Sequence, residues 1–132
     1  MVVTRITRIV LIAAAAACLG LLTWAADLGS TSRFFTALAF GLWVVSPFIF
    51  LLHASLRRRD NRIWQYGLLV TSLLTAGFAC TVYYAAYFIS PDAQSALVFV
   101  FVPLWQWLGQ GFVVAALAFF SRRSGRPGPA AP

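Results

Sequence analysis

The sequence predicts an all-α integral membrane protein, a bundle of four transmembrane helices that run up-down-up-down with both termini in the cytoplasm. Three observations lead to this prediction. Apolar residues make up 61% of the 132-residue chain and charged residues only 10%, whereas an average soluble domain has about 25% charged residues. The apolar residues form four runs long enough to cross a bilayer. Almost all of the arginines flank one side of those runs.

Residues 6–26 form the first predicted span. About 21 mostly apolar residues are enough to cross a hydrocarbon core of roughly 30 Å, and Arg5 and Arg8 stand at the start of this run. A basic start before an alanine-rich run also resembles a secretory signal peptide, with residues 23–25 as a weak cleavage site. We favour an uncleaved span, because the apolar run exceeds the roughly 7 to 15 residues of a signal core.

Residues 34–54 form the second predicted span, which Ser46 and Pro47 interrupt. Proline removes one backbone donor and so frees the carbonyl of Trp43, four residues before Pro47. We expect a kink here, held by a serine or by a neighbouring helix.

Residues 63–88 form the third predicted span, and in it small residues recur at four-residue spacing. A ridge of small side chains lets another helix approach closely, so this face is expected to point into the bundle. The ridge consists of Gly67, Thr71, Thr75 and Ala79.

Residues 96–120 form the fourth span and complete a single transmembrane domain over residues 1–120. Residues 121–132 are basic and rich in proline and glycine. Such a segment cannot bury a core, so we expect a disordered cytoplasmic tail.

The distribution of arginine gives the expected orientation. Each arginine costs roughly 2.5 to 3.5 kcal/mol at the membrane centre, and short arginine-rich loops stay in the cytoplasm. The predicted outer side holds only Arg33. The predicted inner side holds Arg5, Arg8, Arg57, Arg58, Arg59, Arg62, Arg122, Arg123 and Arg126. Many alanines and ten basic residues that are all arginine suggest a GC-rich bacterial genome, so the expected location is the bacterial inner membrane.

Four of these arginines, Arg57, Arg58, Arg59 and Arg62, form the loop between the second and third spans. We interpret them mainly as an orientation anchor. The alternative is contact with anionic lipids of the cytoplasmic face, at about 1 kcal/mol for each arginine near the surface. Nucleic acid is not an expected partner, because the positive charge lies at helix ends rather than on a folded basic face.

Gln106 and Gln110 stand one turn apart on the fourth span, and a rise of about 1.5 Å per residue places Gln106 near the middle of the membrane. We expect interhelical hydrogen bonds from these amides. The candidate partners are Ser46, Thr71, Ser72, Thr75 or a carbonyl that a proline frees. The alternative is a polar contact for a neutral or lipid-like ligand, in a pocket lined by aromatic side chains at similar depth. Those side chains are Trp43, Trp105 and Trp107.

The sequence lacks the residues that several kinds of transport, redox and metal chemistry require. No Asp or Glu lies inside a predicted span, so the chain lacks the carboxylate relay of proton-coupled transport and does not resemble the small multidrug resistance transporters. His53 is the only histidine, and Cys18 and Cys80 both fall in apolar segments, so no haem, zinc or CxxC redox site is expected. We therefore expect no enzymatic activity, no metal and no cofactor.

The leading hypothesis is a small inner-membrane protein of structural or accessory type, which packs with itself or with a larger membrane complex. The alternative is a binding site or conduit for a neutral or lipid-like small molecule, centred on Gln106. A redox or enzymatic subunit that uses His53 or the cysteines is the weakest hypothesis.

Overall fold

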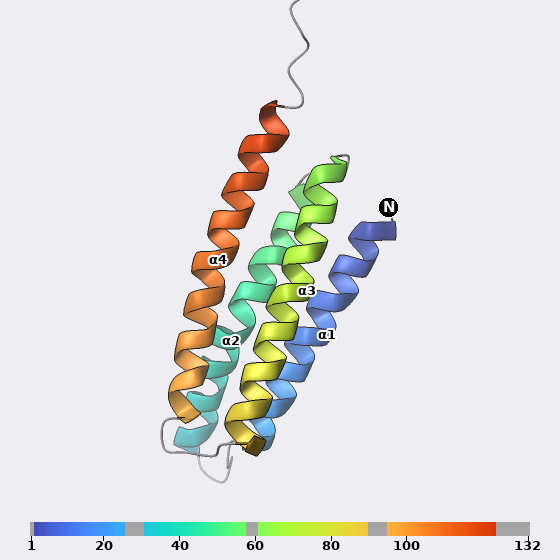
Figure 1. Cartoon of the computed structure of the whole chain (residues 1–132). Coiled ribbons are helices and arrows are strands. Elements are labelled where there is room, and N and C mark those ends of the chain that lie inside the picture. The colour runs from blue at the N-terminus through green and yellow to red at the C-terminus, as the bar shows by residue number, and fades with distance from the viewer. Residues whose placement is uncertain (1, 26–30, 58–60, 90–94, 124–132) are drawn as a thin grey trace, which may run out of the picture.

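The computed structural model describes residues 2–25, 31–57, 61–89 and 95–123, which form four long helices. The helices are α1 (Val2–Ala25), α2 (Thr31–Arg57), α3 (Arg62–Tyr84) and α4 (Ser95–Arg123), and a π-helical turn, η1 (Ala85–Ile89), prolongs α3. Successive helices run in opposite directions, so α1 and α3 begin at the end of the bundle where α2 and α4 finish (Figure 1).

Most of the helices extend beyond the spans that hydropathy marks. α1 begins four residues before the predicted residue 6, α2 continues to Arg57 rather than 54, and α4 continues to Arg123 rather than 120. Helical backbone hydrogen bonding continues into the polar residues that flank each span. The hydropathy of the sequence cannot detect these helix ends, because they contain few apolar residues. The tail beyond residue 123, and residues 58–60 of the arginine loop, lie outside the described residues.

The start of α3 is fixed by a cap. Asn61 is extended (φ −92°, ψ 113°), and its side-chain Oδ1 accepts a hydrogen bond from the backbone N–H of Trp64 at 3.1 Å. This satisfies one of the donors that a helix start leaves free.

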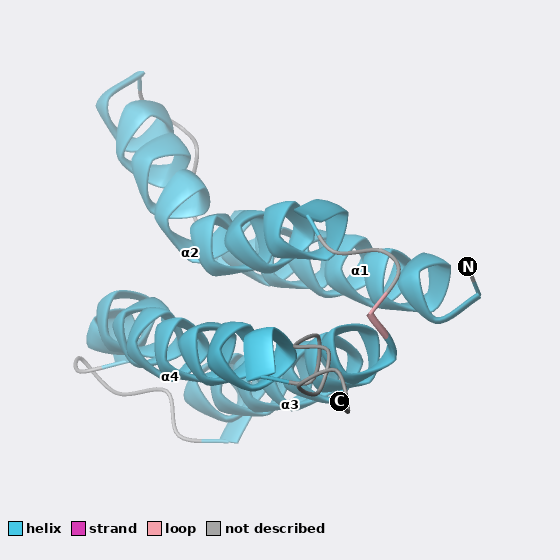
Figure 2. Cartoon of the chain, turned by 90° about the horizontal axis from the view of Figure 1, so that it is seen from above, coloured by secondary structure: helices cyan, strands magenta, loops and turns pink. Residues whose placement is uncertain are grey.

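The helices are arranged in the order α1–α2–α4–α3 around the bundle. α1 packs mainly on α2 and α3, α4 packs on the same two helices, and the direct contact between α2 and α3 is smaller. The view along the bundle shows α1 with α2 in one layer and α4 with α3 in the other (Figure 2). α4 therefore has two packing faces, one toward α2 and one toward α3.

The apolar core lies inside the bundle and receives residues from all four helices. Its largest members include Leu11 of α1, Phe48 of α2, Tyr83 of α3 and Phe99 of α4, and the rings of Tyr83 and Phe99 stack with their centroids 4.6 Å apart.

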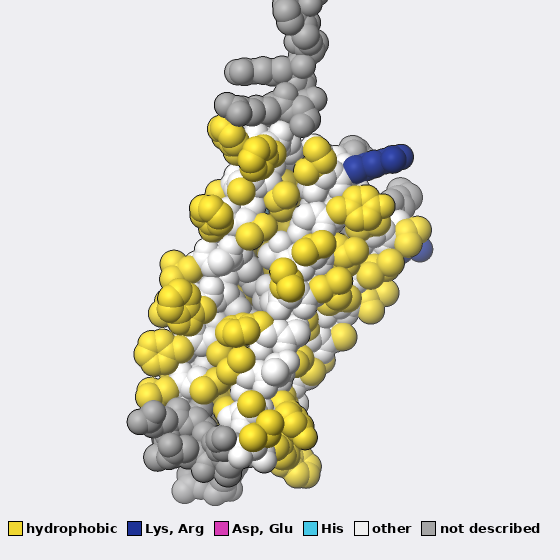
Figure 3. All heavy atoms as spheres, viewed as in Figure 1, with side chains coloured by type: hydrophobic (Ala, Val, Ile, Leu, Met, Phe, Trp, Pro, Cys, Tyr) yellow, Lys and Arg dark blue, Asp and Glu magenta, His cyan; other side chains and the backbone are white. Residues whose placement is uncertain are grey.

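The outer surface is also apolar. Large hydrophobic side chains such as Trp24, Leu74 and Phe112 are largely exposed, and yellow hydrophobic side chains are spread over most of the described surface in Figure 3. A helix that is apolar on all sides is typical of a membrane span. By length and composition the four described helices can all cross a membrane, which indicates a multi-pass membrane protein.

The small-residue ridge of α3 faces the bundle, as predicted. Thr75 and Ala79 are buried, and Gly67 packs against Leu117 of α4 so closely that a Cβ atom there would lie 2.5 Å from Leu117 Cδ2. Glycine at this position thus allows α3 and α4 to approach closely near one end of their seam.

A candidate binding groove between α3 and α4

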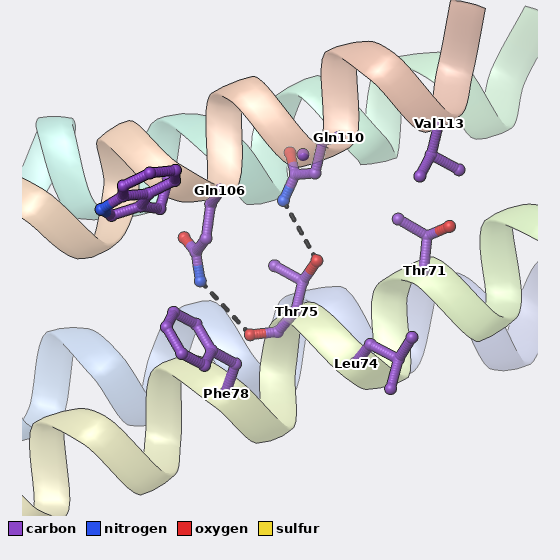
Figure 4. A pocket seen from close by; sticks show the side chains of 9 residues that line it. Thr71, Leu74, Thr75, Phe78, Gln106, Gln110 and Val113 are labelled. Carbon is purple, nitrogen blue, oxygen red and sulfur yellow. Dashed lines mark hydrogen bonds between the residues drawn. The ribbon is translucent and has the colours of Figure 1, made fainter. Parts of the chain in front are cut away.

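A groove of about 260 Å³ lies between α3 and α4 (Figure 4). All of its lining side chains are uncharged. They are Thr71, Leu74, Thr75 and Phe78 of α3 and Trp105, Gln106, Gly109, Gln110 and Val113 of α4.

The floor of the groove is polar, and Thr75 is at its centre. Gln106 Nε2 donates to the backbone carbonyl of Thr75 at 3.3 Å, and Gln110 Nε2 donates to the Thr75 hydroxyl, also at 3.3 Å. Both bonds cross from α4 to α3, as the dashed lines in Figure 4 show. Gln106 is 5% exposed and Gln110 2%, so both amides lie inside the protein rather than at its surface.

Each glutamine leaves its carbonyl oxygen without a partner. Among the described residues no donor reaches Gln106 Oε1 or Gln110 Oε1, although both atoms are buried. The orientation of the Gln106 amide is fixed, because the Thr75 carbonyl can only accept and must face the NH₂ group. A buried acceptor without a donor costs about 1 to 3 kcal/mol, so each of these two oxygens destabilises the fold as it stands.

Gln110 is more adaptable than Gln106, because its partner is a hydroxyl that can donate or accept. If the Gln110 amide turned by 180°, the Thr75 hydroxyl could donate to Oε1, and the free atoms would then be N–H donors. The two amides beneath the groove therefore keep one fixed acceptor, at Gln106, and one group, at Gln110, that can accept or donate.

The rim of the groove is apolar and exposed. Leu74 and Phe78 on α3 and Trp105 on α4 surround the polar floor, and Trp105 is 65% exposed. Gly109 lies between the two glutamines, and a Cβ atom there would meet nothing within 4 Å. The groove thus opens sideways, onto the surface that would face lipid in a bilayer.

Another face of α4, which carries Trp107, contacts the polar residues of α2 that the sequence singled out. Trp107 Nε1 donates to Ser46 Oγ at 2.9 Å, and Ser46 Oγ donates to the Trp43 carbonyl at 2.8 Å. The Trp43 indole donates in turn to the Val100 carbonyl at 3.3 Å. Here a serine holds the carbonyl that Pro47 frees, as predicted. We call this chain of bonds the α2–α4 seam.

The sequence placed three tryptophans at similar depth as candidates for one pocket. The structure puts Trp43 and Trp107 in the α2–α4 seam, so of the three only Trp105 lines the groove. Ser46 likewise contacts Trp107 rather than Gln106.

Leu74, Phe78, Gly109 and Val113 were not singled out from the sequence. Each follows one of the polar residues Thr71, Thr75, Gln106 and Gln110 by three residues, which is a spacing of one helix face. This spacing could have identified the four residues from the sequence if the contact between the polar faces of α3 and α4 had been known.

The remaining candidate residues lie elsewhere. Cys18 on α1 and Cys80 on α3 are both free thiols. In the described part of the chain no three His, Cys, Asp or Glu side chains gather where they could hold a metal ion. Arg57 and His53 line a separate cavity near the end of α2; Arg62 is exposed; and Arg58 and Arg59 lie outside the described residues.

Comparison with known proteins gives no relative: no family profile, no curated protein and no solved structure matches this chain.

Proposed function

We propose that this chain is a small multi-pass protein of the bacterial inner membrane, and that it binds a neutral, lipid-like molecule in the α3–α4 groove. The observation that supports this is the pair of buried carbonyl oxygens without donors, Gln106 Oε1 and Gln110 Oε1. A ligand with a hydroxyl or amide N–H would supply the missing donor after a small movement of the glutamine side chains, because both oxygens are covered in the structure. Its apolar part would lie against Leu74, Phe78 and Trp105.

The ligand is neutral because nothing in the groove would compensate a charge. All nine lining side chains are uncharged, and a charge far from the membrane surface is costly unless it is paired. No lining residue is a nucleophile activated by a neighbouring base. The proposed role is therefore to hold or pass on a molecule, not to convert it.

The accessory hypothesis explains the groove less well. Glutamines that served only to tie α4 to α3 would need only the two N–H bonds to Thr75, and such ties contribute about 0.6 to 2 kcal/mol in membrane systems. That account leaves the two free oxygens as an uncompensated cost. A ligand explains both the bonds that are made and the acceptors that are left.

The test is to fill the groove from a position where there is room. Gly109→Leu places a side chain in the groove, and Gly20→Leu on α1 is the matched control, because a Cβ atom at Gly20 also meets nothing within 4 Å. Each protein is extracted from its native membrane without detergent, and the bound small molecules are identified by mass spectrometry. We expect a neutral species in the original protein and in Gly20→Leu that is lost from Gly109→Leu.

Two results would contradict this proposal. One is the same set of small molecules in all three samples. The other is a stoichiometric protein partner that both leucine variants retain, with no small molecule in any sample, which would favour the accessory hypothesis and packing within a larger complex.

For the orientation, we propose that both termini are cytoplasmic. The arginine count supports this, and so does the fold. The start of α1, the end of α2, the start of α3 and the end of α4 lie at one end of the bundle (Figure 1), and within these helices they carry six arginines of the predicted inner side: Arg5, Arg8, Arg57, Arg62, Arg122 and Arg123. Topology reporters fused at Pro132 and inserted in residues 27–33 should give opposite signals. A periplasmic signal at Pro132 would overturn the orientation.

A further inference from the structure

A second cavity lies near the end of α2 and shares no residue with the groove. Its volume is about 310 Å³, and α2, α3 and α4 all contribute to its lining. Its walls include Phe50, His53, Arg57, Trp64, Val114 and Ala118.

One side of this cavity is basic. His53 and Arg57 stand one turn apart on α2, and both are exposed, so their polar ends can reach the cavity mouth from the same helix face. The three carboxylates of the chain, Asp27, Asp60 and Asp92, fall outside the described residues, so within the described ranges no carboxylate faces Arg57. A guanidinium presents a planar fork of donors that matches a phosphate or a carboxylate.

The position of α3 adds to this positive side. Trp64 Nε1 donates to the Ala54 carbonyl at 3.2 Å, which holds the first turn of α3 against the last turns of α2. The start of a helix carries a partial positive charge that favours anions. Arg62, the first residue of α3, is also exposed near this end.

The other walls are apolar. Phe50 of α2 and Val114 and Ala118 of α4 also line the cavity, and the Phe50 ring contacts the Trp107 ring with centroids 4.9 Å apart. A basic mouth above an apolar wall, at the end of a membrane-spanning bundle, matches a molecule with an anionic head and an apolar chain.

We propose that this cavity is a second binding site, which takes the phosphate or carboxylate head of an anionic amphiphile between Arg57 and His53. The first part of its chain packs against Phe50 and Val114. This site is independent of the α3–α4 groove and of the neutral ligand proposed for it.

The experiment uses the full chain, purified in a neutral maltoside detergent and titrated with dodecyl phosphate or with inorganic phosphate. Binding is measured by the shift in the thermal unfolding midpoint and by native mass spectrometry. We expect dodecyl phosphate to bind and to raise the midpoint, and inorganic phosphate at equal concentration to leave it unchanged. If inorganic phosphate stabilises the protein equally well, the site takes a water-soluble phosphate and the proposed amphiphile is wrong.

Variants locate the site. Arg57→Gln should weaken binding of dodecyl phosphate at least about tenfold, because a charge-assisted bidentate contact is lost. Arg57→Lys should be intermediate, because the charge stays but the fork does not. The matched control is Arg5→Gln, since Arg5 is an exposed arginine of α1 at the same end of the bundle, and it should bind like the original protein.

Ala118→Phe tests the apolar wall, because the new ring would occupy the cavity. We expect it to bind dodecyl phosphate about as poorly as Arg57→Gln does. Equal weakening by Arg57→Gln and Arg5→Gln would show diffuse attraction to the surface and would overturn the proposal. Unchanged binding by a folded Ala118→Phe variant would overturn it as well.

Discussion

The two polar faces of α4 differ in how completely their hydrogen bonds are made. Toward α2, Trp107, Ser46 and Trp43 form a continuous chain in which each polar hydrogen has an acceptor. Toward α3, Gln106 and Gln110 both donate to Thr75, and both keep a buried acceptor free. Polar residues at similar depth in one helix can thus have all their hydrogen bonds made on one face and keep free acceptors on the other.

The chemistry of the groups explains the difference. A serine hydroxyl accepts and donates at once, so Ser46 can join an indole N–H to a carbonyl with nothing left over. A glutamine amide needs both a donor and an acceptor, and the Thr75 carbonyl can only accept. The free oxygen of Gln106 therefore follows from the residue types and not only from their positions.

The sharpest test of this comparison is Gln106→Leu, for which we expect the largest effect. Leucine keeps the approximate volume and removes the free acceptor, so binding of the neutral ligand should fall roughly 5- to 150-fold, which corresponds to about 1 to 3 kcal/mol. The unfolding free energy in detergent should change by about 1 kcal/mol or less, because one modest bond is lost along with one unsatisfied atom. Bound ligand is measured by mass spectrometry and stability by denaturant titration.

Gln110→Leu is the companion of that variant. Since Gln110 can present either a donor or an acceptor, its loss should weaken binding less than the loss of Gln106. If Gln106→Leu retained the ligand fully and lost stability instead, the α3–α4 face would be as structural as the α2–α4 seam. The proposed difference between the two faces would then be wrong.

The opposite behaviour is expected for Ser46→Ala. This change leaves the Trp107 N–H without its acceptor and the Trp43 carbonyl without the hydroxyl that replaces the proline's missing donor. The unfolding free energy should fall by about 1 to 2 kcal/mol, while ligand retention stays the same. Loss of the ligand with unchanged stability would mean that the α2–α4 seam, too, contributes to binding.

Much of the fold could be predicted from the sequence, because the signals are local. Runs of apolar residues mark where chain can cross a bilayer, and Pro47 identifies the carbonyl of Trp43 as the one that needs a new donor. The order of the helices around the bundle could not be predicted. The short connections from α1 to α2 and from α3 to α4 predict that each pair is antiparallel. Their length does not predict that α4 packs on both α2 and α3.

The candidate site was only partly predictable for the same reason. The depth of Gln106 predicted polar contacts within the membrane, Thr71 and Thr75 were among its candidate partners, and all three residues line the groove. Depth alone could not separate Trp105 from Trp107, two residues apart on α4, because such neighbours point in very different directions around a helix. The two free oxygens required knowledge of which partner each amide meets.

The smallest expected effect is that of Trp107→Phe. This variant removes a hydrogen-bond donor without leaving any other polar group unpaired, so it measures the first effect alone. Phenylalanine keeps a ring beside Phe50, where the two rings now lie 4.9 Å apart, and removes only the indole N–H and some volume. Ser46 still donates to the Trp43 carbonyl, so no buried polar atom in the α2–α4 seam is left without its donor. The unfolding free energy should therefore fall by only about 0.6 kcal/mol, the average for a membrane hydrogen bond, and clearly less than for Ser46→Ala. Denaturant titration of both variants in one detergent gives the comparison. If Trp107→Phe were as destabilising as Ser46→Ala, the packing of the indole rather than the continuity of the hydrogen-bond chain would hold α2 to α4.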